Sequence, residues 1–189
     1  MTPPVSIVAA PKILLTGEPG SGKTTAIRAV VSRLRGRVAM TGFVTEEIRE
    51  GDRRTGFRGV TLDGKTFPLA HVRTGGPWRV GPYGVELGGL ESIGLDALAP
   101  AGSGILVIID EIGKMECLSE AFKMRCAQLL DDDTPFLATV AAVGVGFVKR
   151  VRQDRRARHF TLARGGSEVM ADEIVRVIER AMAKGRGTS

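Results

Sequence analysis

The segment from Gly17 to Thr24 combines glycines with a lysine and a threonine at a spacing suited to binding phosphate groups. It fits the pattern G-x-x-x-x-G-K-[ST]. Glycines allow successive backbone N–H groups to turn inward around a β-phosphate, and a helix that begins there directs the positive end of its dipole at the same point. The ammonium of Lys23 can reach the β- and γ-phosphates, and the hydroxyl of Thr24 can bind Mg²⁺. We therefore predict a nucleotide-binding loop, the P-loop, that comprises Gly17, Glu18, Pro19, Gly20, Ser21, Gly22, Lys23, Thr24 and Thr25.

Two adjacent carboxylates follow an aliphatic run farther along the chain. Ile105–Ile109 predicts a buried strand, and Asp110 and Glu111 come at its carboxyl end. Ligands of open α/β sheets bind at that edge. The pattern indicates that Asp110 holds Mg²⁺, usually through water, and that Glu111 orients or deprotonates an attacking water. The alternative is that Glu111 only caps or solvates the end of the strand.

An Asp-Glu pair of this kind favours the division of P-loop proteins in which a further strand separates the two motif strands. The segment Phe136–Val140 predicts such a strand, and Thr139 lies near its end. We therefore consider Thr139 as a polar sensor of the γ-phosphate, although threonine is also a common strand residue.

Three other groups could contribute to a site, and each has a simpler interpretation. Trp78 and Tyr83 could stack a base or could fill space under a loop. Thr45–Glu47 with Arg49 could line the site, but adjacent charges on a strand favour a solvent-facing position. The arginines of Lys149–Arg158 could supply an arginine finger, whereas so dense a run is more typical of a solvated helix face.

The elements that must position these residues alternate between strands and helices. We predict strands at Ile13–Thr16, Phe43–Thr45, Thr55–Leu62, Lys65–His71, Ile105–Ile109, Phe136–Val140 and Phe160–Leu162. We predict helices at Thr24–Leu34, Leu87–Leu98, Ser119–Leu130 and Phe147–Arg156 and from Ser167 onward, with a Gly/Pro-rich loop at Arg73–Pro82. Asp63-Gly64 is a strong hairpin signal. The order predicts one α/β domain over residues 1–189, with a mainly parallel sheet flanked by helices and an antiparallel β-meander after the first helix.

Composition narrows the class of partner. The 189 residues carry 27 Lys and Arg against 21 Asp and Glu, a net charge of +6, and the pI is near 9.8. This excess indicates an acidic partner. Aromatic residues, which nucleic-acid modules use for stacking, make up only 5% of the chain, so a phosphate-bearing small molecule is favoured over nucleic acid.

Compartment is inferred from apolar runs and cysteines. No apolar run reaches the roughly 18 residues needed to span a bilayer. The apolar segment Val5–Leu15 is broken by Pro11 and Lys12 and is interpreted as a first strand, not as a signal peptide. Cys117 and Cys126 could lie on one helix and are interpreted as buried, reduced thiols. We expect a cytoplasmic monomer.

In these motifs the chain resembles the small nucleoside-triphosphatases known as the cancer-related or thermostable NTPase family. Besides the P-loop, the resemblance rests on Gly42–Glu47 with Arg49, Arg54-x-Gly56-Phe57, Leu69–Val72, Val80–Val85, Asp110–Glu116 and Leu137–Val140. It implies a RecA-like fold and slow hydrolysis of ATP, GTP and other nucleoside triphosphates to the diphosphate and phosphate, with broad base preference. The segment Ala141–Gly146 is small and apolar where a polar or His-bearing stretch is expected, so we assign it no catalytic role.

Lys114 lies inside the Asp110–Glu116 signature. Its ammonium could stabilise charge developing on the γ-phosphate, as an arginine finger does, or it could pair at the surface with Glu111 or Glu116. The candidate catalytic set is thus Glu111, Lys23 and Lys114. Two other functions stay open: a P-loop nucleotide or nucleoside kinase, and an RNA-associated switch driven by a nucleoside triphosphate.

Overall fold

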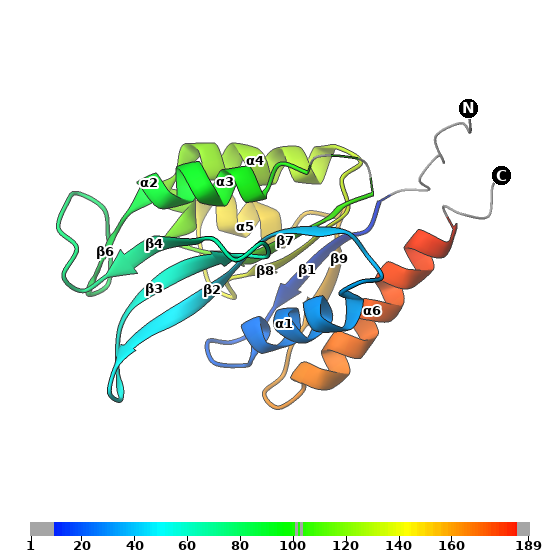
Figure 1. Cartoon of the computed structure of the whole chain (residues 1–189), viewed down its shortest axis with the longest axis horizontal. Coiled ribbons are helices and arrows are strands. Elements are labelled where there is room, and N and C mark those ends of the chain that lie inside the picture. The colour runs from blue at the N-terminus through cyan, green and yellow to red at the C-terminus, as the bar shows by residue number, and fades with distance from the viewer. Residues whose placement is uncertain (1–9, 101, 103, 185–189) are drawn as a thin grey trace.

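The computed structural model describes residues 10–100, 102 and 104–184, in which strands and helices alternate (Figure 1). The first part contains β1 (Lys12–Thr16), α1 (Lys23–Leu34), β2 (Met40–Glu50), β3 (Arg53–Thr61), β4 (Thr66–His71), β5 (Arg79–Val80), β6 (Tyr83–Val85), α2 (Leu87–Gly89), the π-helix η1 (Leu90–Gly94) and α3 (Leu95–Ala97). It is followed by β7 (Leu106–Ile112), the 3₁₀-helix η2 (Glu116–Leu118), α4 (Glu120–Asp131), β8 (Phe136–Val140), α5 (Gly146–Arg152), β9 (Arg158–Thr161) and α6 (Ser167–Lys184). None of the described helices is long and apolar enough to cross a membrane.

The strands of the described residues form one nine-stranded sheet in the order β5-β6-β4-β3-β2-β7-β8-β1-β9. Pairing is parallel from β2 through β9, and antiparallel from β2 outward through β3, β4, β6 and β5. The predicted α/β fold is confirmed. The meander is continuous with the parallel sheet, because β2 belongs to both parts. β8 lies between β1 and β7, as the Asp-Glu pair predicted.

Helices cover both faces of the sheet, with α1 and α6 on one face and α2 to α5 on the other (Figure 1). Successive side chains of β7 alternate between the two cores: Leu106 and Ile108 pack with residues of α1 and α6, and Val107 and Ile109 pack with residues of α4 and α5. A strand buried on both faces has no polar side, which is why the sequence of β7 is an unbroken aliphatic run.

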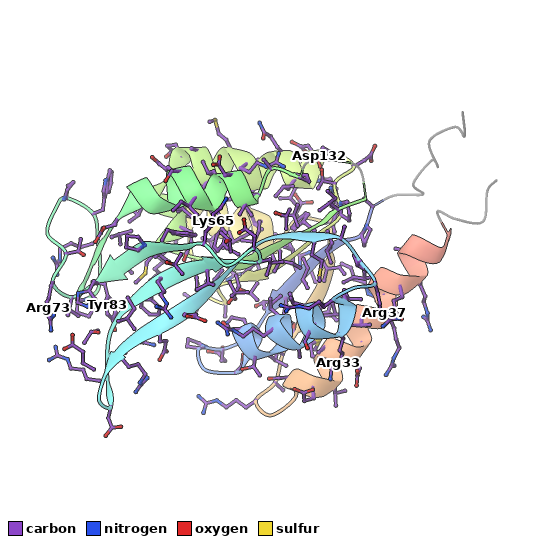
Figure 2. The ribbon with its side chains drawn as sticks, in the orientation of Figure 1. Arg33, Arg37, Lys65, Arg73, Tyr83 and Asp132 are labelled. Atoms are coloured by element: carbon purple, nitrogen blue, oxygen red, sulfur yellow. The ribbon has the colours of Figure 1, made fainter. Side chains whose placement is uncertain are left out.

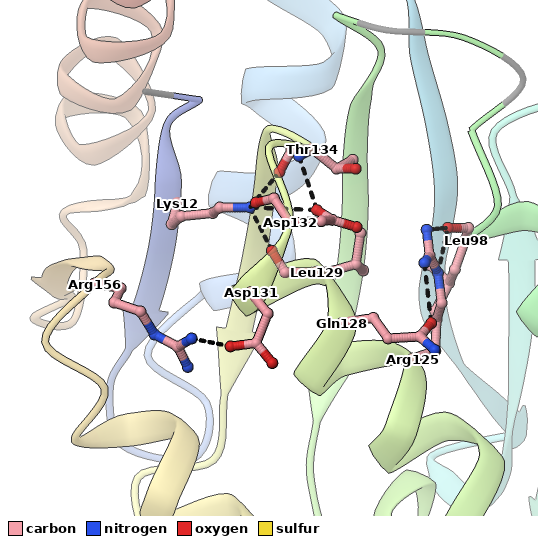
Figure 3. Close-up of polar contacts among 9 residues, drawn as sticks. All are labelled: Lys12, Leu98, Arg125, Gln128, Leu129, Asp131, Asp132, Thr134 and Arg156. Carbon is pink, nitrogen blue, oxygen red and sulfur yellow. Dashed lines mark hydrogen bonds and ion pairs between the residues drawn. The ribbon is translucent and has the colours of Figure 1, made fainter. Parts of the chain in front are cut away.

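Charged side chains fix the outer helices at places remote from the carboxyl edge of the sheet. Lys12, at the start of β1, donates to the backbone carbonyls of Leu129, Asp132 and Thr134 at the end of α4 and in the turn before β8 (Figure 3). Burial lowers the pKa of Lys12. Figure 2 shows Arg33 on α1 and Arg37 in the turn after it, where they form ion pairs with acidic residues of α6.

Several predicted boundaries are wrong. The helix α5 ends at Arg152 and does not reach Arg156, because the Asp154 carboxylate accepts the backbone N–H of Arg156 and starts a turn toward β9. The loop Arg73–Pro82 contains β5, which forms a hairpin with β6. Cys117 and Cys126 lie on different helices, η2 and α4, and both are free.

Three predicted elements need a smaller adjustment. The predicted helix 87–98 is one continuous helical segment, but its central turn is the π-helix η1. β7 continues through the acidic pair to Ile112, and the peptide bond between Asp110 and Glu111 is cis. Residues 5–9 of the predicted first strand lie outside the described residues.

Candidate active site

The P-loop connects β1 to α1, and its shape depends on Gly22. This residue has φ of 96°, in the left-handed region that side-chain-bearing residues rarely adopt, and α1 begins directly after it at Lys23. A Cβ atom at Gly22 would lie 2.3 Å from Oγ of Ser167. That hydroxyl, at the start of α6, donates to the Gly22 carbonyl at 3.2 Å. The first residue of α6 therefore supports the back of the loop.

Lys23 lies across its own loop. Its Nζ donates to the carbonyl oxygens of Gly17 at 2.9 Å and Glu18 at 3.3 Å. A lysine held in this way carries its charge over the loop, where the backbone N–H groups and the N-terminus of α1 also favour an anion.

Asp110 is buried on β7, with 1% of its surface exposed. Its Oδ1 accepts a hydrogen bond from Thr139 on β8 at 2.7 Å, and its Oδ2 accepts one from Thr45 on β2 at 3.2 Å. A buried carboxylate is costly unless such donors compensate for the lost water. Thr139 is itself fully buried and does not line the cavity described below, so its hydroxyl serves Asp110.

Glu111 lies one residue later and faces a cavity. Burial raises the pKa of its carboxyl group, and the nearby charge of Lys23 opposes that rise. A carboxylate with a raised pKa that remains in contact with a cavity is suited to accept a proton from a reacting group.

Glu116 is a third acidic residue at this place, and we assigned it no role from the sequence. Its Oε2 accepts the backbone N–H of Gly113 at 3.2 Å. Burial, with a smaller contribution from the charge of Glu111, raises the pKa of Glu116 to about 8. The signal that could have identified it is its place at the end of the Asp110–Glu116 signature. A carboxyl group that holds a proton at neutral pH can donate a hydrogen bond into the cavity that it lines.

The cavity has a volume of about 810 Å³ and joins these residues to the P-loop. Six predicted P-loop residues line it, namely Pro19, Gly20, Gly22, Lys23, Thr24 and Thr25, and so do Glu111 and Lys114. Gly17, Glu18, Ser21 and Asp110 do not; Ser21 and Asp110 are buried behind the surface. The described residues provide no ion pair to Lys114.

The far wall of the cavity belongs to the meander, which corrects our preference for a solvent-facing Thr45–Glu47 segment. Glu46 accepts hydrogen bonds from Arg28 of α1 and Arg58 of β3. Glu47 accepts them from Arg49 and Arg54. The charged segment thus lines the site with carboxylates that arginines hold in place.

The aromatic candidates lie near this wall but not in it. The Tyr83 ring packs edge-on against Phe57, with 5.2 Å between the ring centroids. The Tyr83 hydroxyl accepts a hydrogen bond from Nε of Arg54. Figure 2 shows Tyr83 at the meander end of the sheet. Trp78 is 46% exposed and does not line the cavity. The space-filling interpretation of Tyr83 is therefore supported.

The basic segment Lys149–Arg158 contributes no lining residue. Arg156 pairs with Asp131 (Figure 3). Arg156 also pairs with Asp154, and Arg152 donates to the Ala142 carbonyl. These arginines connect the end of α5 to its neighbours, which supports the structural interpretation of the run.

The oxygen donors near the P-loop suit Mg²⁺. No group of three or more His, Cys, Asp or Glu side chains among the described residues could hold a metal ion. Mg²⁺ is usually bound by only one or two protein oxygens together with substrate phosphates and water. The hydroxyl of Thr24 and the carboxylate of Asp110 fit that requirement.

Comparison with known proteins agrees with this geometry. A family model described as NTPase matches residues 12–175. The chain is 40% identical over 169 residues to the nucleoside-triphosphatase THEP1 of Thermotoga maritima, a match that covers 89% of this chain and 95% of that protein. It is 35% identical over 184 residues to the cancer-related nucleoside-triphosphatase homolog of Mus musculus, covering 88% and 96% of the two chains.

Two solved structures have the same fold. The crystal structure of THEP1 from Aquifex aeolicus is similar with a TM-score of 0.80 and 35% identity, covering 89% of this chain and 99% of that chain. The solution structure of a human cancer-related nucleoside triphosphatase gives a TM-score of 0.77 and 34% identity, covering 90% and 98%. The resemblance inferred from the motifs is confirmed.

Proposed function

Because this chain belongs to the nucleoside-triphosphatase family and hydrolyses nucleoside triphosphates, we propose that the reaction takes place in the cavity between the P-loop and the end of β7. The products are the nucleoside diphosphate and inorganic phosphate. The observation that carries this proposal is the position of Glu111. Its half-buried carboxylate lies on the cavity wall, close enough to Lys23 for the lysine charge to oppose the rise in its pKa.

The P-loop and Lys23 hold the triphosphate. Backbone N–H groups of the P-loop point to the phosphates, and the ammonium of Lys23 leaves its carbonyl partners to contact the β- and γ-phosphates. Thr24 and Asp110 would hold Mg²⁺, which would neutralise charge on the phosphates. Thr45 and Thr139 keep the Asp110 carboxylate in one orientation for that purpose.

Glu111 acts as the general base. An oxygen–phosphorus bond forms between the attacking water and the γ-phosphorus, and the bond from the γ-phosphorus to the bridging oxygen breaks. The water proton passes to the Glu111 carboxylate. Lys114 lies on the same wall and stabilises the negative charge that develops on the transferred group.

We further propose a broad base preference, because the P-loop contacts only phosphates, which all nucleoside triphosphates share. We also propose slow turnover, which is what the resemblance to the family implies. One domain, acting as a monomer in the cytoplasm, would carry the activity. Cys117 and Cys126 are free, and burial raises the pKa of Cys117 to about 12 and raises that of Cys126 as well, so both are poorly reactive thiols. Free thiols fit a reducing compartment.

The test is a phosphate-release panel over ATP, GTP, CTP and UTP, with Mg²⁺ and with excess EDTA. We expect release from all four, within about tenfold of one another, and loss of release in EDTA. The same panel with added RNA addresses the switch hypothesis. Release that depends on RNA, or that persists in EDTA, contradicts the proposal.

A further inference from the structure

The cavity continues past Glu111 onto the antiparallel part of the sheet. We name this part the meander wall and define it by Glu46, Glu47, Arg54, Phe57, Leu69 and Val80. The cavity volume of about 810 Å³ lies in the upper part of the range found for single small-molecule sites, roughly 300–1,000 Å³. A triphosphate on the P-loop therefore leaves this part of the cavity for another group.

The strand order indicates on which side of the γ-phosphate the meander wall lies. β7 lies between β2 and the pair β8 and β1, so Glu111 stands between the P-loop and the wall. In phosphoryl transfer the attacking and leaving oxygens lie roughly in line on opposite sides of the γ-phosphorus. When the γ-phosphate faces Glu111, the nucleoside end points away from β7. The meander wall is then on the side of the attacking oxygen.

The wall combines an apolar surface with polar groups that are held in place. Phe57, Leu69 and Val80 provide the apolar part, and the Arg54 guanidinium lies 4.9 Å from the Phe57 ring centroid. The side chains of Glu46 and Glu47 are 27% and 42% exposed, and each is fixed by two arginines. An apolar surface with a few oriented polar groups is typical of a small-molecule site.

These groups match a nucleoside. A planar base can pack on the apolar part, and carboxylates accept hydrogen bonds from the amino groups of bases and from ribose hydroxyls. We propose that the meander wall binds a nucleoside acceptor and that its 5′-hydroxyl can replace water in attacking the γ-phosphate. This inference rests on the proposed function, because it uses the same P-loop and the same Glu111.

The step balances without a further reactant. A bond forms between the 5′-oxygen and the γ-phosphorus, and the bond to the bridging oxygen breaks, leaving its electron pair on the diphosphate. The hydroxyl proton passes to Glu111. The products are a nucleoside 5′-monophosphate and a nucleoside diphosphate. A hydroxyl suits this site better than an acceptor phosphate, because a phosphate oxygen brings no proton for Glu111 to accept.

The experiment supplies ATP labelled on the γ-phosphate, Mg²⁺ and one of adenosine, guanosine, cytidine or uridine to the full chain. Labelled nucleoside monophosphate and labelled inorganic phosphate are measured together. We expect labelled monophosphate from at least one nucleoside, with a matching fall in free phosphate. A parallel arm replaces each nucleoside with its 5′-monophosphate, and another supplies an oligonucleotide with a free 5′-hydroxyl.

Substitutions of Phe57 test whether transfer to the nucleoside depends on the meander wall. In Phe57→Ala the ratio of transfer to hydrolysis should fall by tenfold or more, and Phe57→Leu, which keeps most of the apolar surface, should recover part of the ratio. Trp78→Ala, outside the cavity, should leave the ratio unchanged.

The outcomes separate this inference from the proposed function. Phosphate release with no labelled nucleoside 5′-monophosphate overturns the acceptor site and leaves hydrolysis intact. Label transferred only to an added 5′-monophosphate, giving a labelled nucleoside diphosphate, or only to the oligonucleotide also overturns it. Absence of both phosphate release and transfer counts against the proposed function itself.

Discussion

The Thr139 hydroxyl donates a 2.7 Å hydrogen bond to Oδ1 of Asp110, across the boundary between the neighbouring parallel strands β8 and β7. On the other side of β7, Thr45 of β2 donates to Oδ2 of the same carboxylate. Three strands thus converge on one buried anion. This explains how an aliphatic sheet can hold a carboxylate at the edge where we propose that Mg²⁺ binds.

Replacing Thr139 by valine should weaken the binding of Mg²⁺ to the enzyme and also lower the stability of the fold. Valine keeps the shape of threonine but leaves one oxygen of Asp110 without its donor, at a cost of about 1–3 kcal/mol. We expect a higher Mg²⁺ concentration for half-maximal activity and a lower urea midpoint. Thr161→Val, at an exposed position on β9, is the control. Unchanged Mg²⁺ dependence would show that the hydrogen bond does not orient Asp110.

Replacing Lys114 by alanine should lower kcat with little change in nucleotide affinity, because we propose that its ammonium acts on charge developed in the transition state. Removal of one such group commonly costs about 10²–10³ in rate. Single-turnover hydrolysis and nucleotide titration give the two quantities, with Lys65→Ala, on the hairpin turn before β4, as control. An unchanged kcat would assign Lys114 to the surface.

Glu116→Gln should remove a specific dependence of stability on pH. The pKa of Glu116 is about 8 in the folded chain, against an ordinary value of 4.5 for a glutamate. The folded state therefore retains a proton that the unfolded chain loses, and stability falls as pH rises from 4.5 to about 8. The slope approaches about 1.4 kcal/mol per pH unit within that window.

Urea unfolding at pH 5, 6, 7 and 8 measures this slope. The Gln variant should give a flatter profile than the parent chain, whereas Glu120→Gln, at an exposed position on α4, should keep the parent slope. Parallel profiles for the parent chain and Glu116→Gln would exclude a protonated Glu116.

The sequence predicted the features that follow from local chemistry. The P-loop, the buried strand before Asp110 and the hairpin at Asp63-Gly64 each depend on neighbouring residues, and each was predicted near its observed place. The order of β1, β8 and β7 was also predicted, because the Asp-Glu pair is associated with one arrangement of the sheet.

The rest depends on contacts between distant segments. From the sequence, Glu46 and Glu47 were predicted to face solvent. They line the cavity because β2 packs against β7 and because α1 brings Arg28 close to Glu46. Glu116 had only its place at the end of the Asp110–Glu116 signature as a signal, and its burial depends on packing that the local sequence does not show. The end of α5 was misplaced because the basic run was read as one helix, whereas the Asp154 carboxylate accepts the backbone N–H of Arg156 and forms a turn there.

The central claim is that Glu111 accepts the proton of the attacking group, and Glu111→Gln tests it most directly. Glutamine keeps the size of the side chain and cannot act as a base. Nucleotide affinity and single-turnover hydrolysis are measured on this variant and on Glu120→Gln. We predict that Glu111→Gln binds Mg²⁺-ATP within about threefold of the parent chain and hydrolyses it at least about a hundredfold more slowly. Hydrolysis within about threefold of the parent rate, with binding intact, would contradict the account.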